Sequence, residues 1–172
     1  KQCSQIFFKG SSRAYDLARR RLAKIEQMNK DIKTMVNIYT KEKVYVWNNK
    51  RASIHSLYVY NFYAQLLQSD CKVLEFIKEP RWLDGKYRSD GFFKIVDIYG
   101  NIRILCLEVD ITHLTNIEKY EEIYLSKEIQ NKYGGFPMIV IMGYKPMEYN
   151  GNLDVRFIDF KLSNFSSIFP TV

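Results

Sequence analysis

The chain has few of the residues that build zinc sites or disulfide frameworks. Its 172 residues include three cysteines, Cys3, Cys71 and Cys106, and two histidines, His55 and His113. No Cys-x-x-Cys or His-x-x-x-His pair occurs, which argues against both kinds of framework. Free thiols are typical of a reducing compartment, so we expect an intracellular, cytoplasmic protein.

Several other signatures are absent. Neither G-x-G-x-x-G nor G-x-x-x-x-G-K-[S/T] occurs, which argues against a nucleotide-binding fold of either type. The longest uncharged apolar stretch, Tyr133 to Tyr144, is shorter than the roughly 18 residues that a membrane helix needs, so we expect no membrane partner. With 47% hydrophobic and 15% aromatic residues, the chain is instead expected to bury an ordinary core.

Positive charge is concentrated in the first third of the chain. The net charge is +7. Residues 1–51 contain thirteen basic and four acidic residues, whereas residues 52–172 contain thirteen basic and fifteen acidic ones. A surface that binds an anionic partner is therefore expected in residues 1–51.

The basic segment has the pattern of two helices and a hairpin. After a short helix from Gln2 to Phe8, the spacing predicts a helix from Ser11 or Ser12, as N-cap, to about Met28. Its apolar stripe is Ala18, Leu22, Ile25 and Met28, and its basic side chains lie opposite or at the edges. A hairpin is expected next, with strands Asp31–Tyr39 and Lys43–Trp47 and a turn at Thr40-Lys41-Glu42.

This order predicts a winged helix-turn-helix over residues 1–51 whose usual first helix is absent. The arginine-rich helix is expected to enter the major groove of double-stranded DNA, while lysines of the wing contact phosphate. The expected contacts are Arg13, Arg19, Arg20, Arg21, Lys24, Lys41 and Lys43. A solvated basic helix followed by an ordinary hairpin is the alternative.

Residues 52–172 predict a second, α/β (α+β) module, a mixed sheet flanked by helices. The expected elements are a helix Ser53–Leu67, a strand Val73–Ile77, a polar loop Pro80–Arg88, a central hairpin, a helix from Asn116 to about Lys132, and strands Met138–Met142 and Val155–Phe160.

The central hairpin carries acidic residues at one end. If the chain reverses at Tyr99-Gly100, the numbers of two residues that face each other across the hairpin add up to about 199. This register puts Asp90 opposite Val109, with Glu108 and Asp110 beside it. Three converging carboxylates repel one another, and a bound Mg²⁺ or Mn²⁺ would stabilise them. The alternative is structural: Asp90 caps a turn, and the other two carboxylates pair with Arg88 or Lys119.

This arrangement resembles the restriction-endonuclease-like superfamily, and more narrowly the replication-relaxation family of plasmids, phages and conjugative elements. The resemblance rests on short stretches in a fixed order over residues 2–145: Ser11-Ser12-Arg13, Ala18-Arg19-Arg20-Arg21-Leu22, Val44-Tyr45-Val46, Ile54-His55-Ser56-Leu57, Arg88-Ser89-Asp90-Gly91-Phe92-Phe93, Leu107-Glu108-Val109-Asp110, and Lys119-Tyr120 with Tyr124. It implies a nuclease-type site in which Asp90, Glu108 and Asp110 hold the metal.

Two positions depart from the superfamily pattern. Ser89 stands where a proline usually precedes the aspartate, and Asp110 stands where Glu-x-Lys has its lysine. That lysine orients water and offsets phosphate charge in such nucleases, and an aspartate supplies no cation. We expect Lys119 to replace it in a catalytic role beside Glu108, with Lys94 as the second candidate.

The expected function is that of a DNA-binding protein in a mobile element's replication or transfer system, with metal-dependent nicking as its hypothetical enzymatic activity. Two alternatives remain: a non-catalytic initiator or accessory factor, and a transcriptional regulator with a degenerate nuclease-like domain. Replication or transfer proteins, and a second copy of the chain in a homodimer, are the further partners that these interpretations allow.

Overall fold

The computed structural model describes residues 1–37, 41–48 and 53–169. The chain divides into two compact units, Lys1–Ala64 (unit 1) and Gln65–Val172 (unit 2), and the division falls within helix α3 (Ile54–Gln68). The predicted boundary between residues 51 and 52 lies outside the described residues.

Unit 1 begins with the expected helices and hairpin. Helices α1 (Gln2–Phe7) and α2 (Ala14–Met28) precede the antiparallel strands β1 (Ile32–Val36) and β2 (Lys43–Trp47). The backbone N–H of Thr34 donates to Glu26 Oε1 at 2.8 Å, which joins β1 to α2. Thr40 of the predicted turn lies outside the described residues. These elements fit the predicted order, and the winged-helix assignment stays a prediction.

The start and end of α2 differ from the prediction. Arg13 is the N-cap, because Ser11 Oγ accepts the Arg13 N–H at 3.2 Å and so caps a turn before the helix. Ala18 is buried, but Met28 is 76% exposed, so the apolar stripe does not reach the helix end.

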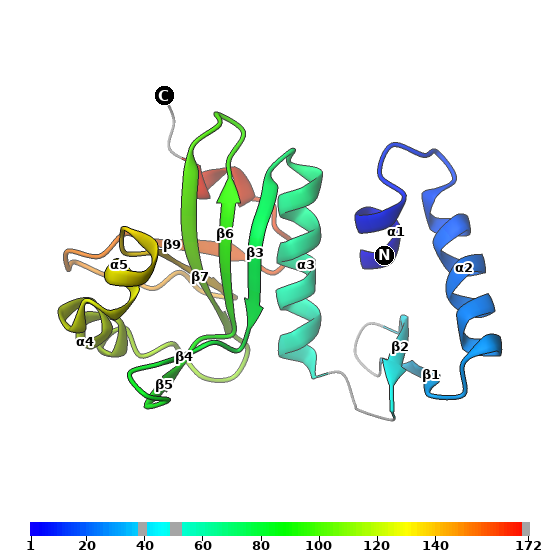
Figure 1. Cartoon of the computed structure of the whole chain (residues 1–172), viewed down its shortest axis with the longest axis horizontal. Helices are drawn as coiled ribbons and strands as arrows, with labels where there is room; N and C mark the ends of the chain where they lie inside the picture. Colours follow the sequence, from blue (N-terminus) through cyan, green and yellow to red (C-terminus); the bar gives the residue numbers. More distant parts are fainter. Residues whose placement is uncertain (38–40, 49–52, 170–172) are drawn as a thin grey trace. The chain divides into compact units, whose positions relative to one another are not determined.

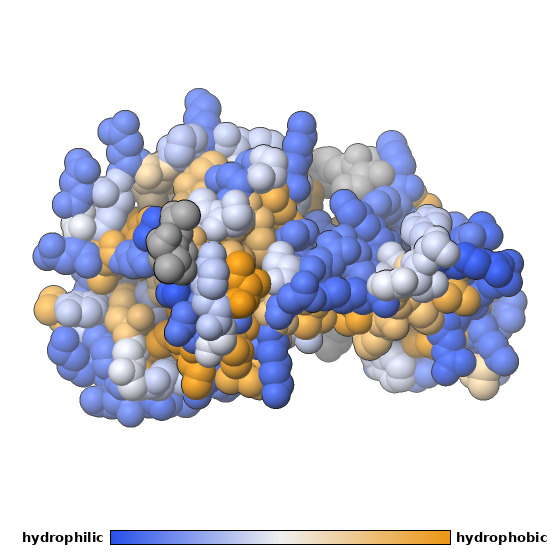
Figure 2. All heavy atoms as spheres, turned by 90° about the horizontal axis from the view of Figure 1, so that it is seen from above, coloured by the Kyte–Doolittle hydropathy of each residue, from blue (hydrophilic) through white to orange (hydrophobic). Residues whose placement is uncertain are grey.

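Other large hydrophobic side chains of unit 1 are exposed as well, namely Phe7, Tyr15 and Trp47. On the face shown in Figure 2, exposed hydrophobic side chains lie among hydrophilic ones.

Helix α3 begins one residue after the predicted start. Ser53 Oγ accepts the Ser56 N–H at 3.1 Å, so Ser53 caps the helix. In unit 1, Gln2 Nε2 donates to the Leu57 carbonyl oxygen at 2.8 Å and to Asn61 Oδ1 at 2.9 Å. These bonds tie α1 to the first turns of α3. In the described part of the chain, no helix has the length and hydropathy to cross a membrane.

Unit 2 contains the mixed sheet. Among the described residues, five strands lie in the order β3-β6-β7-β8-β9. Figure 1 shows β3, β6 and β7 side by side. The bounds of the five strands are Lys72–Lys78, Gly91–Val96, Ile102–Asp110, Met138–Gly143 and Val155–Asp159. Strands β3, β6 and β7 are antiparallel, whereas β7, β8 and β9 are parallel. This confirms the α+β class and the central position of the acidic hairpin.

Two predicted segments of unit 2 are subdivided. The helix expected from Asn116 to Lys132 is two helices, α4 (Glu118–Ser126) and α5 (Glu128–Tyr133), because Lys127 adopts a left-handed conformation with φ 61°. The expected loop Pro80–Arg88 contains short strands β4 (Arg81–Trp82) and β5 (Tyr87–Arg88), which pair with each other. A 3₁₀ helix, η1 (Phe165–Ile168), lies near the end of the described residues.

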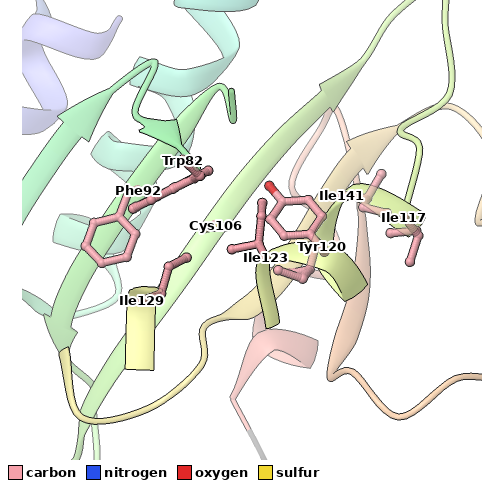
Figure 3. Close-up of a cluster of buried hydrophobic side chains, with 9 residues drawn as sticks. Trp82, Phe92, Cys106, Ile117, Tyr120, Ile123, Ile129 and Ile141 are labelled. Atoms are coloured by element: carbon pink, nitrogen blue, oxygen red, sulfur yellow. The ribbon is translucent and has the colours of Figure 1, made fainter. Parts of the chain in front are cut away.

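Helices α4 and α5 cover one face of the sheet. Phe92 and Cys106 are cross-strand partners on this face, and they pack with Tyr120 and Ile123 of α4 and Ile129 of α5 in one buried cluster (Figure 3). Side chains alternate along a strand, so Glu108 and Asp110 belong to the same face as Cys106. The acidic residues therefore continue an apolar face toward its end.

The register of the β6–β7 hairpin differs from the prediction by one residue. Facing residues are Gly91 and Leu107 at one end and Val96 and Ile102 at the other, so their numbers sum to 198 rather than 199. The loop has three residues, 98–100, because Gly100 takes the left-handed conformation (φ 84°) typical of such loops. Continuing the register puts Asp90 opposite Glu108 instead of Val109, on the same face of the sheet.

Asp97 holds this loop. Its buried carboxylate accepts the N–H groups of Tyr99 and Asn101, each at 2.9 Å, and pairs with Arg103. Burial alone would raise the pKa of Asp97, but the Arg103 and backbone donors outweigh it and hold the pKa below its usual value. The ionised carboxylate therefore stabilises the turn.

We predict that Asp97→Asn lowers the free energy of unfolding at pH 7 by about 1.5–3 kcal/mol, because it removes hydrogen bonds to a charged group. The pKa of Asp97 is lower in the folded than in the unfolded protein. The stability that its carboxylate adds is therefore fully present above about pH 4 and is lost as the pH drops through the folded pKa. Urea unfolding from pH 7 to pH 2 measures this. A stability difference that does not shrink at low pH would contradict the assignment.

Candidate functional site

Asp90 and Glu108 meet where the central strands end. The Asp90 N–H donates to the Leu107 carbonyl oxygen at 3.1 Å, and its Oδ2 accepts the Val109 N–H at 2.8 Å. Asp90 is half-buried and Glu108 is buried. The charge of Asp90 is close enough to raise the pKa of Glu108. Two carboxylates thus share one end of the sheet face, as the sequence pattern predicts.

Lys119 reaches this pair from the first turn of α4. Its Nζ lies 2.8 Å from Glu108 Oε1 and 3.0 Å from the carbonyl oxygen of Arg88. These two contacts hold the ammonium of α4 between Glu108 of β7 and Arg88 of β5, and only 15% of the Lys119 side chain is exposed. The structure therefore brings the expected cation to Glu108. Lys94, the second candidate, lies opposite Glu75 on β3, farther along β6.

Asp110 has a different partner. Its Oδ1 accepts the Thr115 hydroxyl at 2.6 Å, and its Oδ2 accepts the Thr115 N–H at 2.9 Å. Both carboxylate oxygens thus hold the segment that leads from β7 to α4. The cluster that the structure brings together is Asp90, Glu108 and Lys119 (the acidic-end site), with Asp110 bound to its own loop.

A chain of buried hydrogen bonds ends on Glu108. Trp82 Nε1 donates to Ser89 Oγ at 3.0 Å, and Ser89 Oγ lies 2.7 Å from the Tyr120 hydroxyl, which donates to Glu108 Oε1. Because the Tyr120 proton goes to Glu108, Ser89 must donate to Tyr120, so every donor points toward the carboxylate. Trp82, Ser89 and Tyr120 are 4%, 1% and 0% exposed.

The electrostatics of Glu108 follow from this environment. Burial is the largest influence and raises its pKa, while Lys119 and the Tyr120 hydroxyl oppose the rise. Burial and the adjacent Glu108 raise the pKa of Tyr120 well above its ordinary value. Tyr120 is therefore a neutral hydrogen-bond donor that keeps its proton at neutral pH.

The serine at position 89 explains a departure noted in the sequence. Its N–H donates to the Pro80 carbonyl oxygen at 3.2 Å, and its hydroxyl links Trp82 to Tyr120. A proline has neither a backbone donor nor a hydroxyl. In place of Ser89 it would lose the hydrogen bond to the Pro80 carbonyl oxygen and would interrupt the hydrogen-bond chain between Trp82 and Tyr120. Sequence reasoning missed this network, although Ser89 in an unusual place and Tyr120 beside Lys119 were its visible signs.

The residues of unit 1 that are predicted to contact DNA are all exposed. They are Arg13, Arg19, Arg20, Arg21, Lys24, Lys41 and Lys43. Arg19 lies 3.6 Å from Asp16 one helical turn away. Arg13 stands at the start of α2, and Lys43 begins β2. The DNA contacts stay predictions, on a surface where these side chains are accessible.

The acidic-end site fits a hard divalent cation by its donor chemistry. Carboxylate oxygens are the ligands that Mg²⁺ and Mn²⁺ prefer, and Mg²⁺ is commonly held by one or two carboxylates together with substrate phosphate. Asp90 and Glu108 supply two carboxylates. Among the described residues, no group of three or more His, Cys, Asp or Glu side chains is placed to hold a metal ion.

Comparisons with protein-family models, with curated proteins and with solved structures find no match for this chain.

We predict that Tyr120→Phe destabilises the protein by about 1–3 kcal/mol, because it leaves Ser89 and Glu108 without the buried hydroxyl between them. Ser89→Ala breaks the same chain, so in a double-mutant cycle the two losses should not add. Urea denaturation measures both. The matched control is Tyr144→Phe, because Tyr144 is 73% exposed and loses the same hydroxyl at the surface. Additive losses would show that the two hydroxyls act independently.

Proposed function

We propose that this chain is a DNA-binding protein of a mobile element's replication or transfer system, and that unit 2 nicks DNA with Mg²⁺ or Mn²⁺. The observation that carries the nuclease proposal is the Lys119 ammonium, which lies 2.8 Å from Glu108 Oε1, together with the Asp90 carboxylate, which is close enough to raise the pKa of Glu108. A cation and two carboxylates at the end of adjacent central strands are groups that metal-dependent phosphodiester hydrolysis can use.

Each residue has a distinct role in this proposal. Asp90 and Glu108 would hold the metal, which when bound polarises the phosphate and lowers the pKa of coordinated water. Lys119 supplies positive charge for a phosphate that gains negative charge during hydrolysis. Its second bond, to the Arg88 carbonyl oxygen, fixes where that charge lies. Tyr120 holds the Glu108 carboxylate in one orientation.

The DNA-binding part of the proposal rests on unit 1. The exposed basic residues that we assign to DNA lie on α2 and at its N-cap, and at Lys41 and Lys43 where β2 begins. Arginine and lysine side chains neutralise backbone phosphates, which supplies most of the affinity of non-specific DNA binding. The assignment to a replication or transfer system rests on the order of short motifs that resembles the replication-relaxation family.

A non-catalytic initiator, accessory factor or regulator is the second candidate. Glu108 Oε1 already accepts from Lys119 and Tyr120, and both oxygens of Asp110 accept from Thr115. Carboxylates that are satisfied within the protein are also what a degenerate nuclease fold retained for binding would contain.

We predict that Glu108→Gln abolishes metal-dependent nicking of supercoiled plasmid, because it removes a carboxylate charge but keeps the side-chain shape. Lys119→Gln should slow nicking by at least about tenfold, as expected when a group that stabilises charge in the transition state is removed. Gel assays in magnesium or manganese score both. Lys161→Gln, an exposed lysine of unit 2, is the control.

Metal binding gives a readout that does not depend on turnover. At 100 times its dissociation constant, a cation that binds only the folded protein adds about 2.7 kcal/mol to stability. Manganese should therefore raise the melting temperature of the wild type but not that of an Asp90→Asn, Glu108→Gln variant. Absence of wild-type nicking on duplex, single-stranded and forked DNA would reject the enzyme and favour the second candidate.

We predict that replacing Arg13, Arg20 and Lys24 together by alanine weakens duplex DNA binding. The slope of log affinity against log salt should fall by about one for each phosphate that the variant no longer neutralises. Fluorescence anisotropy at several salt concentrations measures this. Lys145→Ala, at an exposed position in unit 2, controls for a general reduction of charge. Unchanged affinity in the triple variant would reject α2 as the DNA-binding helix.

A further inference from the structure

Two arginines face each other directly before the acidic-end site. In the β4–β5 ribbon, Arg81 is the cross-strand partner of Arg88, and both residues are exposed. Like charges directly opposite each other destabilise an antiparallel pair. Arg88 approaches Glu79 only at 3.8 Å, and no carboxylate is in ion-pair distance of Arg81 among the described residues. The ribbon thus places two positively charged residues at facing positions, and one of them, Arg88, has Glu79 as its ion-pair partner.

The ribbon that carries them is firmly attached to the helices over the site. Glu122 of α4 accepts from Lys86 and from the Tyr87 hydroxyl, and Glu128 Oε2 of α5 accepts the Leu83 N–H at 2.6 Å. On the inner side of the ribbon, the cross-strand pair of Trp82 and Tyr87 packs on the buried cluster. Side chains alternate along a strand, so Arg81 and Arg88 occupy the opposite, outer side.

The ribbon is also joined to the acidic-end site. The carbonyl oxygen of Arg88 accepts from the same Lys119 Nζ that contacts Glu108, and Ser89 and Asp90 follow in the chain. A single ammonium therefore links the backbone of the arginine pair to the carboxylates. Unit 2 has more acidic than basic residues, so this local pair of cations runs against the charge of its surroundings.

We propose that Arg81 and Arg88 bind a phosphate of the DNA backbone and so hold the substrate strand next to the acidic-end site. The guanidinium group presents a planar fork of donors that matches phosphate oxygens, and an anion between two such forks removes their repulsion. This inference rests on the proposed function, and it assigns unit 2 its own DNA contact, separate from α2.

The test is DNA binding by the full chain in EDTA, where no metal-dependent cleavage takes place. Arg81→Gln, Arg88→Gln should lower the salt slope of anisotropy titrations on a short mixed-sequence duplex and on its single strands by about one, because the pair contacts one phosphate. The matched control, Lys72→Gln, Lys161→Gln, removes two exposed charges of unit 2 elsewhere and should leave the slope unchanged. Arg81→Lys, Arg88→Lys should keep the slope, because both charges remain.

Thermal melting without DNA gives a second readout. If the arginines repel each other and serve a ligand, the double glutamine variant should melt at the same temperature as the wild type or higher. A wild-type salt slope in this variant overturns the inference, and if the wild type also nicks plasmid, the proposed function stands without it. A reduced slope together with no wild-type nicking supports the phosphate contact and rejects the proposed catalysis.

Discussion

The register of β6 against β7 is the constraint on which the acidic-end site depends. A shift by one residue would move Asp90 from the face of Glu108 to the opposite face of the sheet, because side chains alternate with a period of two. The three-residue loop with Gly100 at φ 84° and the buried Asp97 carboxylate set this register. Residues that are distant from the site therefore decide which carboxylates meet.

Burial of Glu108 creates a cost that its neighbours offset only in part, because the pKa of Glu108 stays above its ordinary value. A carboxylate that is only 6% exposed requires compensating charge or hydrogen bonds, and Lys119 and Tyr120 provide both. Tyr120 also packs in the cluster under α4, and Ser89 ties it to Trp82. The same side chain thus serves core and site, so the core cannot be repacked around Tyr120 without disturbing the carboxylate.

The sequence predicts the elements of the fold better than their ends. The strongly periodic helix α3 is displaced by one residue, and the uninterrupted apolar strand β8 begins at the predicted Met138. The break at Lys127 was missed, because a lysine with φ 61° carries no glycine or asparagine signal. The spacing predicts that Asp90 and Glu108 converge, but it places Asp90 opposite Val109 and includes Asp110, whose carboxylate binds Thr115. The Trp82 to Glu108 chain was not, since it joins residues from four segments that only tertiary packing brings together.

Several costs to stability gather around the acidic-end site. Leu83 and Asp84 in the β4–β5 turn have φ of 52° and 53°, a conformation that costs non-glycine residues about 1 kcal/mol or more each. Arg81 and Arg88 put like charges at facing positions of the same ribbon, and Glu108 is buried beside Asp90. Each of the three could be relieved by a simple substitution. Their position around one pair of carboxylates agrees with the phosphate ligand that we propose, since an anion and a cation bound there would compensate the arginines and the carboxylates together.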